Sequence, residues 1–251
     1  PPQKVSAEDH PHAADVQYPL FPHQREVLRR AGTLLQSSPR RLLIHMPTGS
    51  GKTRTAMNLV SDHLRTKEPA LVVWLAASEE LCDQAASEFR TAWRSRGDRE
   101  VNLSRWWGRE ALPDTIPSDG LIIAGLAKLH SRCIEDPIWM ARLGDSLSLV
   151  VFDEAHQAIA PSYRHVVEAL LARSPHIALV GLSATPGRTW NDIDEDALLA
   201  DFFSRQKVTL KVDGYSSPLD YLIKEGYLAR PKFVRLEHHG PITTPTEQRH
   251  L

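Results

Sequence analysis

Cysteine is scarce in this sequence, and that scarcity excludes a scaffold built from disulfide bonds. Only Cys82 and Cys133 occur among the 251 residues, and we expect both to be reduced thiols inside a cell. The twelve histidines do not compensate, because their spacing matches no zinc-binding pattern and neither cysteine has a partner nearby in the sequence. There is therefore no sign of a structural metal site.

Long apolar runs are missing as well. No stretch approaches the roughly 20 residues that a membrane-spanning helix needs, and the proline-rich start has no apolar core of a secretory signal. We therefore expect an intracellular protein, cytoplasmic or associated with the nucleoid, with no membrane partner. The first residue is not Met, which suggests a piece of a longer chain.

An excess of positive charge is also absent. Lys and Arg number 30 against 31 Asp and Glu, which gives a formal net charge of -1. A dedicated nucleic-acid-binding domain often has a pI above about 9, so the overall charge does not indicate a nucleic-acid partner. It does not exclude one, because a groove can be basic on a neutral protein.

What the sequence does contain is an alternation of short apolar runs with stretches of helical period. The apolar runs are uninterrupted, which is typical of strands in a parallel sheet that helices cover on both faces. They occupy residues 41–45, 70–76, 120–125, 147–154 and 176–183. Helical spacing marks residues 23–36, 53–64 and 79–93. The alternation predicts an α/β fold, a mostly parallel sheet flanked by helices.

The order of elements is weaker toward the end of the chain. There we expect a helix at 191–205, a strand at 207–212, a helix at 218–228 that ends at Gly226, and a strand at 232–236.

The sequence HMPTGSGKT, residues 45–53, follows the first apolar run and precedes a helical stretch. In that position, glycines allow close approach of the backbone, and N–H groups at a helix N-terminus point at an anion. Lys52 would reach the β- and γ-phosphates of a nucleotide, and the Thr53 hydroxyl would bind Mg²⁺. We call residues 45–53 the phosphate loop. A glycine-rich turn without a nucleotide is the alternative, since Met46 stands where such loops usually begin with Gly or Ala.

A second set of polar residues follows the apolar run at 147–152. Asp153 and Glu154 stand at the carboxyl end of this expected strand, where ligand sites of open α/β sheets lie. One carboxylate can hold Mg²⁺ while its neighbour polarises the attacking water. Alone, the pair could be a solvated acidic turn, but together with a phosphate loop it supplies both halves of a nucleotide hydrolysis site.

MPTGSGKT, DEAH (153–156) and GLSATPGRT (181–189), in this order, resemble the first motor lobe of a superfamily 2 helicase or translocase of the DEAH type. The resemblance covers about residues 20–237 and implies a RecA-like P-loop NTPase domain that uses ATP and Mg²⁺. It places the catalytic base at Glu154, with Lys52 also catalytic, and magnesium ligands at Thr53 and Asp153. It assigns ATP binding to Gln24, Pro47, Thr48, Gly49, Ser50, Gly51, Lys52, Thr53 and Arg54. It also implies that His156, Ser183 and Thr185 couple the nucleotide state to nucleic-acid binding.

Weaker matches concern nucleic acid and the branch of the family. The segment before the phosphate loop resembles one whose glutamine, here Gln24, recognises adenine, although a solvent-facing glutamine is the alternative. Residues 75–84 and 122–130 resemble motifs that touch the nucleic-acid backbone, which makes Ser78, Gln84 and Gly125 candidate contacts. The whole pattern looks most like the branch named after the restriction-enzyme motor subunit. That resemblance favours DNA over RNA and allows protein partners in a restriction, repair or defence complex.

Arginine and tryptophan alternate between residues 90 and 109. Exposed tryptophan beside arginine can stack on bases and bind phosphates. The other interpretation packs Trp93 inward from a helix end and places Trp106 and Trp107 on a strand that enters the core. We favour packing, because acidic residues interrupt the basic stretch.

Motors of this family also need a second RecA-like lobe with an arginine finger, and no matching motif occurs in the sequence. We therefore expect residues 1–18 to be a linker or N-terminal arm, 19–237 the first RecA-like domain, and 238–251 a linker towards a second lobe. The leading hypothesis is an ATP-hydrolysing motor lobe of a DNA helicase or translocase, weakly active when isolated. The alternatives are a restriction or phage-defence motor that translocates without unwinding, and an ATP-switched nucleic-acid binding module.

Overall fold

The computed structural model describes residues 17–174, 176–184, 193–212 and 214–230. Four features expected from the sequence lie wholly or largely outside the described residues. They are the strand at 232–236, the linker at 238–251, Thr185, and the N-terminal arm except for its last two residues. Tyr18, which the sequence placed in the arm, is buried in the core with 2% of its surface exposed. The folded part of the chain therefore includes the end of the expected arm.

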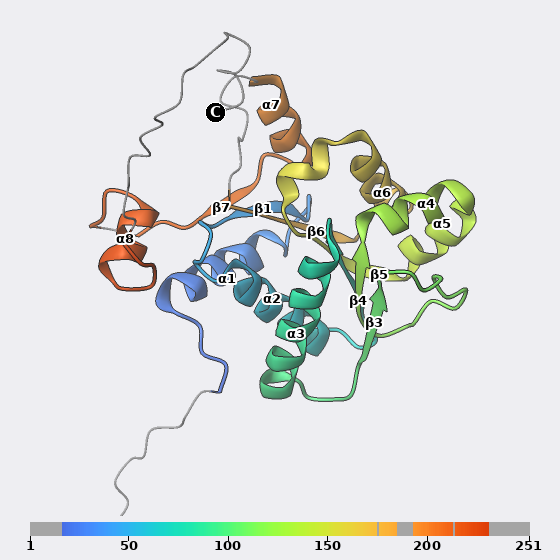
Figure 1. The fold of residues 1–251 in the computed structure, drawn as a ribbon, viewed down its shortest axis with the longest axis horizontal. Helices are drawn as coiled ribbons and strands as arrows, with labels where there is room; N and C mark the ends of the chain where they lie inside the picture. Colours follow the sequence, from blue (N-terminus) through green and yellow to red (C-terminus); the bar gives the residue numbers. More distant parts are fainter. Residues whose placement is uncertain (1–16, 175, 185–192, 213, 231–251) are drawn as a thin grey trace, which may run out of the picture.

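A seven-stranded sheet forms the centre of the described structure (Figure 1). Its strands are β1 (Arg41–His45), β2 (Leu71–Ala76), β3 (Asn102–Trp106), β4 (Gly120–Gly125), β5 (Leu147–Phe152), β6 (Ala178–Ser183) and β7 (Lys207–Thr209). The spatial order is β3-β4-β2-β5-β6-β1-β7. Every pairing between these strands is parallel. The prediction of a mostly parallel sheet is confirmed.

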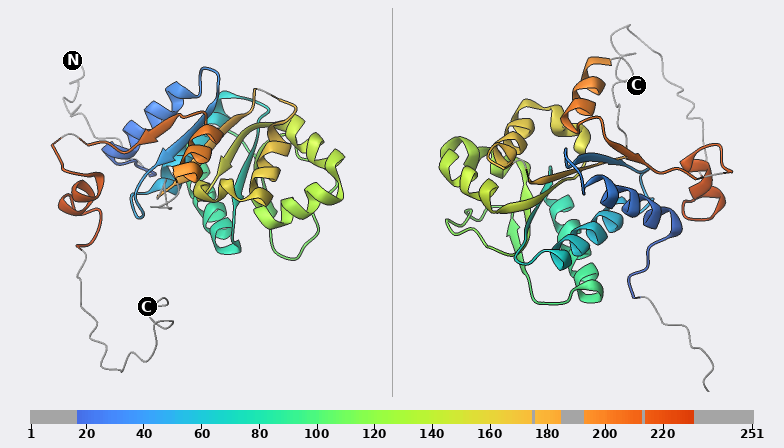
Figure 2. Two further views of the ribbon diagram at one scale, coloured as in Figure 1. Left: turned by 90° about the horizontal axis from the view of Figure 1, so that it is seen from above. Right: turned by 180° about the vertical axis from the view of Figure 1, so that it is seen from behind.

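Helices cover both faces of this sheet, as the two further views show (Figure 2). They are α1 (Pro22–Leu34), α2 (Lys52–Thr66), α3 (Glu79–Arg96), α4 (Leu126–Glu135), α5 (Pro137–Ser146), α6 (Pro161–Leu171), α7 (Ile193–Phe202) and α8 (Pro218–Lys224), with a short 3-10 helix η1 (Ala155–Ile159). Buried residues of α1, α2, α3 and α8 pack on one face, and those of α4 to α7 pack on the other. None of these helices has the length and apolar character that crossing a bilayer requires.

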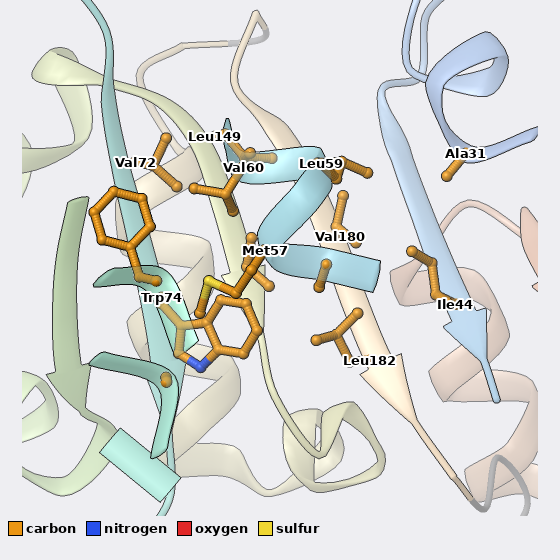
Figure 3. Packing of buried hydrophobic residues seen from close by; sticks show 14 of the residues in the cluster. Ala31, Ile44, Met57, Leu59, Val60, Val72, Trp74, Leu149, Val180 and Leu182 are labelled. Carbon is orange, nitrogen blue, oxygen red and sulfur yellow. The ribbon is translucent and has the colours of Figure 1, made fainter. Parts of the chain in front are cut away.

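The two packed faces explain why a central strand such as β2 is apolar at every position. In β2, Val72 and Trp74 point into the core under α2, whereas Val73 and Leu75 point into the core on the other side. Trp74 is fully buried and lies beside Met57 of α2 (Figure 3). Since successive side chains of a strand point to opposite faces, a strand buried on both sides shows no alternation of apolar and polar residues.

The expected and observed elements agree best in the first half of the chain. The strands at 41–45 and 120–125 have the expected bounds, and the helices at 53–64 and 79–93 are longer by one to three residues at their ends. Toward the end of the chain the elements are shorter than expected. The strand predicted at 207–212 stops at Thr209, and the helix predicted to reach Gly226 stops at Lys224.

A pair of helical glycines allows a test of how tightly α5 packs on α6. A Cβ added at Gly144 of α5 would lie 2.6 Å from the Leu170 carbonyl oxygen of α6, whereas one added at Gly32 of α1 would meet nothing within 4 Å. We expect Gly144→Ala to lower the free energy of unfolding by about 1–3 kcal/mol through overpacking. Gly32→Ala should raise it by up to about 1 kcal/mol, because alanine favours helix. Urea denaturation of both variants checks this, and a stabilised Gly144→Ala would contradict the packing described.

Candidate functional site

The candidate site lies at the carboxyl edge of the sheet. Because all the strands are parallel, the segments that follow β1, β5 and β6 leave the sheet at the same edge. β6 pairs with β1 on one side, where His45 is opposite Ser183, and with β5 on the other, where Phe152 is opposite Gly181. The phosphate loop, the Asp-Glu pair and Ser183 are thus brought together from three neighbouring strands. This edge is where open α/β sheets bind ligands.

The phosphate loop turns sharply between β1 and α2, and two glycines allow the turn. Gly49 has φ 78° and Gly51 has φ 81°, which is left-handed backbone that residues with a Cβ rarely adopt. The Ser50 N–H donates to the Pro47 carbonyl oxygen at 3.2 Å, and the Ser50 hydroxyl donates to the same oxygen at 2.6 Å. The loop is therefore a closed turn with its shape held internally.

Met46, which departs from the usual start of such a loop, is a core residue here. Its side chain is fully buried, and its N–H donates to the Ser183 carbonyl oxygen at 3.1 Å. The bond extends the pairing of β1 with β6 by one residue. An apolar side chain at this position packs under the loop, so the departure from Gly or Ala is compatible with the expected geometry.

Lys52, the first residue of α2, contacts Glu154. Its Nζ lies 3.1 Å from Glu154 Oε1, with 11% of the lysine side chain and 29% of the glutamate side chain exposed. The other carboxylate oxygen, Glu154 Oε2, lies 3.3 Å from His156 Nδ1. Glu154 itself has φ 50°, a left-handed conformation that aims its side chain back toward the phosphate loop. Three residues predicted from two separate motifs thus form one contiguous array.

Asp153 is the most buried charged group of the site, with 5% of its surface exposed. Its Oδ1 accepts a hydrogen bond from the Glu154 N–H at 3.0 Å. Burial raises the pKa of this carboxyl, and the nearby Lys52 charge opposes that rise. A cation at this edge would favour the ionised form, so the carboxylate fits a magnesium ion.

Waters and the phosphates of a bound nucleotide can supply other ligands of such an ion. Among the described residues, no group of three or more His, Cys, Asp and Glu side chains could hold a metal by itself. Mg²⁺ usually keeps several waters and binds through one or two carboxylates together with substrate phosphates. Asp153 and the half-buried Thr53 in the first turn of α2 suit that kind of shared coordination.

Gln24 lies beneath the phosphate loop. It is buried with 1% of its surface exposed, which excludes a solvent-facing side chain. Its Oε1 accepts from the Phe21 N–H at 2.9 Å, and its Nε2 donates to the Ser50 carbonyl oxygen at 2.9 Å. A Cβ on Gly51 would collide with that amide. Gln24 therefore braces the loop from α1, which leaves one N–H and one lone pair for other partners.

The other predicted ATP-binding residues differ in their surroundings. Thr48 and Gly49 are exposed at the tip of the loop, and Pro47 is half-buried beside them. The Arg54 guanidinium lies over the Tyr18 ring, 4.1 Å from its centroid. This cation–π contact holds Arg54 on α2 against the N-terminal segment.

The candidate nucleic-acid residues follow β2 and β4, which are neighbours with Ala76 opposite Gly125. Ser78 caps α3, its hydroxyl accepting from the Leu81 N–H at 3.4 Å, and Gln84 is exposed on that helix. A Cβ on Gly125 would make an ordinary contact with Trp107 at 3.6 Å. Ser78 and Gly125 thus lie at the same edge as the phosphate loop, and Ser78 also stabilises its own helix.

The tryptophans of the arginine-rich stretch are mostly packed. Trp106 is 4% exposed and lies 5.4 Å from the ring of Trp139, and the Trp93 indole N–H donates to the Arg99 carbonyl oxygen at 2.9 Å. Trp107 is half-buried, with the Arg105 guanidinium over its ring at 4.5 Å. Trp93, like Trp107, is half-buried and packs against the core, so the packing interpretation holds, with Trp106 the most buried of the three.

Sequence reasoning missed two residues beside the phosphate loop. His23 precedes Gln24, and its Nε2 lies 3.3 Å from the Ser50 carbonyl oxygen. Leu228 lies far along the chain, yet its Cδ2 would be only 2.5 Å from a Cβ on Gly49. No local pattern marks Leu228, because its position depends on how the segment after β7 returns to the loop.

A parallel sheet that presents a phosphate loop and an Asp-Glu pair at one edge defines the ATP-binding lobe of a RecA-like motor. Residues 17–188 match the family described as the res subunit of Type III restriction enzymes. The chain belongs to this family. The match covers the phosphate loop, the Asp-Glu pair and the first residues after β6.

Individual proteins similar to this chain are helicases and Dicer-like proteins. The DEAD-box ATP-dependent DNA helicase Fancm of Drosophila melanogaster is 27% identical over 176 residues, 69% of this chain and 12% of that protein. Dicer-like protein 2 of Aspergillus terreus is 30% identical over 156 residues, 58% of this chain and 11% of that protein. The chain thus spans about one eighth of the length of these relatives.

Solved structures share the fold. The Hef helicase domain of Pyrococcus furiosus matches with a TM-score of 0.57 at 21% identity, over 76% of this chain and 38% of that one. The helicase MrfA bound to DNA matches with a TM-score of 0.56 at 18% identity, over 78% of this chain and 28% of that one. These matches confirm the RecA-like α/β fold.

Proposed function

We propose that this lobe binds Mg-ATP and hydrolyses it to drive movement of a helicase or translocase on DNA. The observation that carries the proposal is the contact between Lys52 and Glu154 at 3.1 Å beside the buried Asp153. It joins the cation of a phosphate loop to the carboxylates that follow β5. The experiment is calorimetric titration with Mg-ATP and with Mg-free ATP. Binding that requires both Mg²⁺ and Lys52 supports the proposal, and no binding would contradict it.

Each residue of the array has a proposed task. The backbone N–H groups of the loop and the Lys52 ammonium bind the β- and γ-phosphates. Asp153 and Thr53 hold Mg²⁺, which when bound neutralises charge on the phosphates. Glu154 accepts a proton from the attacking water, and its position beside Lys52 places that base next to the phosphates. Phosphoryl transfer relies on such positioning and on charge stabilisation.

His156 and Ser183 are proposed to couple the nucleotide to the nucleic acid. His156 contacts the carboxylate of Glu154, and Ser183 ends the strand between β1 and β5. Both therefore lie beside the ATP-binding residues, at the edge of the sheet where Ser78 and Gly125 also lie. A change in the position of Glu154 would reach His156 directly.

Replacing His156 tests this coupling. We expect His156→Ala to leave Mg-ATP affinity within about twofold and to reduce DNA-stimulated ATP turnover about five- to tenfold, which corresponds to about 1 kcal/mol, the usual contribution of one polar contact. Turnover with and without duplex DNA, in the protein together with its second lobe, is the measurement. His176→Ala, at an exposed position, is the control. Equal loss of the basal and stimulated rates would contradict the coupling role.

DNA is the proposed nucleic acid, with RNA as the alternative. Two of the similar proteins named above are described as a DNA helicase and as a helicase bound to DNA, while another similar protein is described as an RNA helicase, DHX58 of Mus musculus. Competition of duplex DNA and duplex RNA for the protein, at one stated salt concentration, distinguishes the two. Tighter binding of RNA would overturn the preference.

The proposed lobe works with a second RecA-like lobe and possesses little activity alone. Whether the complete protein unwinds duplexes or translocates without unwinding is decided by comparing strand displacement with triplex displacement. An ATP-switched binding module would instead show ATP-dependent DNA binding with negligible turnover. Proteins of a restriction, repair or defence complex are the proposed partners.

A further inference from the structure

The segment after β7 folds back to the phosphate loop. It contains α8, capped by Ser217, whose hydroxyl accepts from the Asp220 N–H at 3.1 Å, and it lies beside the N-terminal end of α1 (Figures 1 and 2). Tyr215 and Tyr227 flank Tyr221 with ring centroids at 5.0 and 5.6 Å. Leu222 is fully buried. We call residues 217–228 the C-terminal latch.

Leu228 makes the first contact of the latch with the loop. Its N–H donates to the Leu222 carbonyl oxygen at 2.9 Å, which ties the end of the latch to the buried part of α8. The Leu228 side chain packs so closely on Gly49 that an added Cβ would lie 2.5 Å from its Cδ2. The loop backbone at Gly49 thus rests on a side chain that α8 holds in place.

Tyr221 makes the second contact, through His23. The His23 Nε2 lies 3.3 Å from the Ser50 carbonyl oxygen, and its Nδ1 lies 3.4 Å from the Tyr221 hydroxyl. A carbonyl oxygen only accepts, so Nε2 carries the proton. In the neutral ring Nδ1 then accepts from Tyr221. Burial lowers the pKa of His23, which favours this neutral form.

The Ser50 carbonyl oxygen matters because of peptide geometry. In a planar trans peptide the C=O and the following N–H point in opposite directions. His23 and Gln24 approach the Ser50 oxygen from α1, so the Gly51 N–H points to the other side of the loop. Lys52 follows Gly51 in the chain and contacts Glu154, and a phosphate bound at the start of α2 would accept from such N–H groups. Fixing the Ser50 carbonyl therefore orients a donor for the anion.

We propose that the C-terminal latch positions the phosphate loop, with His23 and Tyr221 holding the Ser50–Gly51 peptide and Leu228 supporting Gly49. The inference rests on the proposed binding of Mg-ATP by this loop. ATP affinity then depends on a segment that lies outside the phosphate loop and the Asp-Glu pair. His23, Tyr221 and Leu228 are positioning residues.

The proposal has a reciprocal consequence. If the latch favours the binding-competent loop, then ATP binding must favour the docked latch by the same free energy. Hydrogen exchange of amides in residues 217–228 should therefore slow when Mg-ATP is added. A purely structural role for the latch predicts no such change.

Deletion of one hydroxyl group and truncation of one apolar side chain test the latch. We expect Tyr221→Phe and Leu228→Ala each to weaken Mg-ATP binding about three- to tenfold, as loss of one hydrogen bond or of local packing does. Tyr215→Phe removes the same hydroxyl from the neighbouring ring, whose partner is Glu225 rather than the loop. It should change affinity less than twofold, roughly the limit for surface substitutions. Calorimetry gives the affinities, and circular dichroism verifies the fold.

A double-mutant cycle distinguishes the chain of contacts Tyr221–His23–Ser50 from a general loosening of the fold. In a His23→Ala background, Tyr221→Phe should have little further effect on affinity, because this chain of contacts is already broken. If Leu228→Ala fails to fold, the Mg-ATP affinity of Tyr221→Phe alone tests the proposal. Wild-type binding that requires Lys52 but is unchanged in Tyr221→Phe and Leu228→Ala overturns the latch and leaves the proposed function standing. Failure of the wild-type protein to bind Mg-ATP overturns both.

Discussion

Replacing Glu154 by glutamine is expected to reduce ATP turnover about a hundredfold or more, the usual contribution of a general base. In the wild-type protein the Lys52 Nζ lies 3.1 Å from the Glu154 carboxylate. Glutamine keeps the shape of the side chain and an oxygen for this contact, but it cannot accept a proton as a general base. Asp153, the proposed magnesium ligand, is untouched, so Mg-ATP should still bind. Steady-state phosphate release by the protein together with the proposed second lobe, alongside calorimetric binding, measures both quantities.

Glu168→Gln is the matched control for this experiment. Glu168 lies on α6 and pairs with Arg164 at 2.7 Å on the surface, and exposed pairs of this kind contribute at most about 1 kcal/mol. Its replacement should leave turnover unchanged. Near-normal turnover in Glu154→Gln would show that another residue acts as the base.

Replacing Lys52 by alanine is expected to weaken ATP binding about ten- to a hundredfold, because charge-assisted hydrogen bonds contribute about 1.5–3 kcal/mol each. Lys52 starts α2 directly behind the two left-handed glycines of the loop, and its Nζ lies at the Glu154 carboxylate. The variant removes the positive charge from a site that keeps both carboxylates. Repulsion between these carboxylates and the phosphates then adds to the loss.

Calorimetry with Mg-ATP measures this effect. Lys211→Ala, at an exposed position after β7, removes the same charge elsewhere and should leave affinity unchanged. Circular dichroism of both variants should match that of the wild-type protein, since Lys52 is not part of the apolar core. Wild-type affinity in a folded Lys52→Ala would refute the assignment of the phosphate loop.

The sequence predicted the central strands and the two main motifs because their signals are local. A strand buried on both faces is apolar at each position, and the phosphate loop carries its glycines and lysine within a few residues. Lys52 and Glu154 could be assigned to one site from their motifs. Their contact at 3.1 Å, across 102 residues of sequence, required the strand order β5-β6-β1.

Features that depend on long-range packing were not predictable in this way. The α4–α5 pair was not singled out, although Asp136 and Pro137 carry a helix-start signal and Asp136 Oδ1 accepts from the Trp139 N–H at 2.9 Å. Gln24 was expected to face a ligand, and its brace on Ser50 appears only when α1 is placed under the loop. The docking of Leu228 on Gly49 has no counterpart in local sequence at all.

The position of β1 in the sheet has a consequence for how the protein is made. β1 is flanked by β6 and β7, the last two strands of the described chain to be synthesised. Domains generally fold as units during synthesis, from the N-terminus onward. Here the phosphate loop leaves the ribosome early, but its strand finds its first partner only after Ala178–Ser183 has emerged and its second only after Lys207–Thr209. Such non-local pairing slows folding, so the nascent chain exposes the apolar β1 longer than any other strand of this sheet.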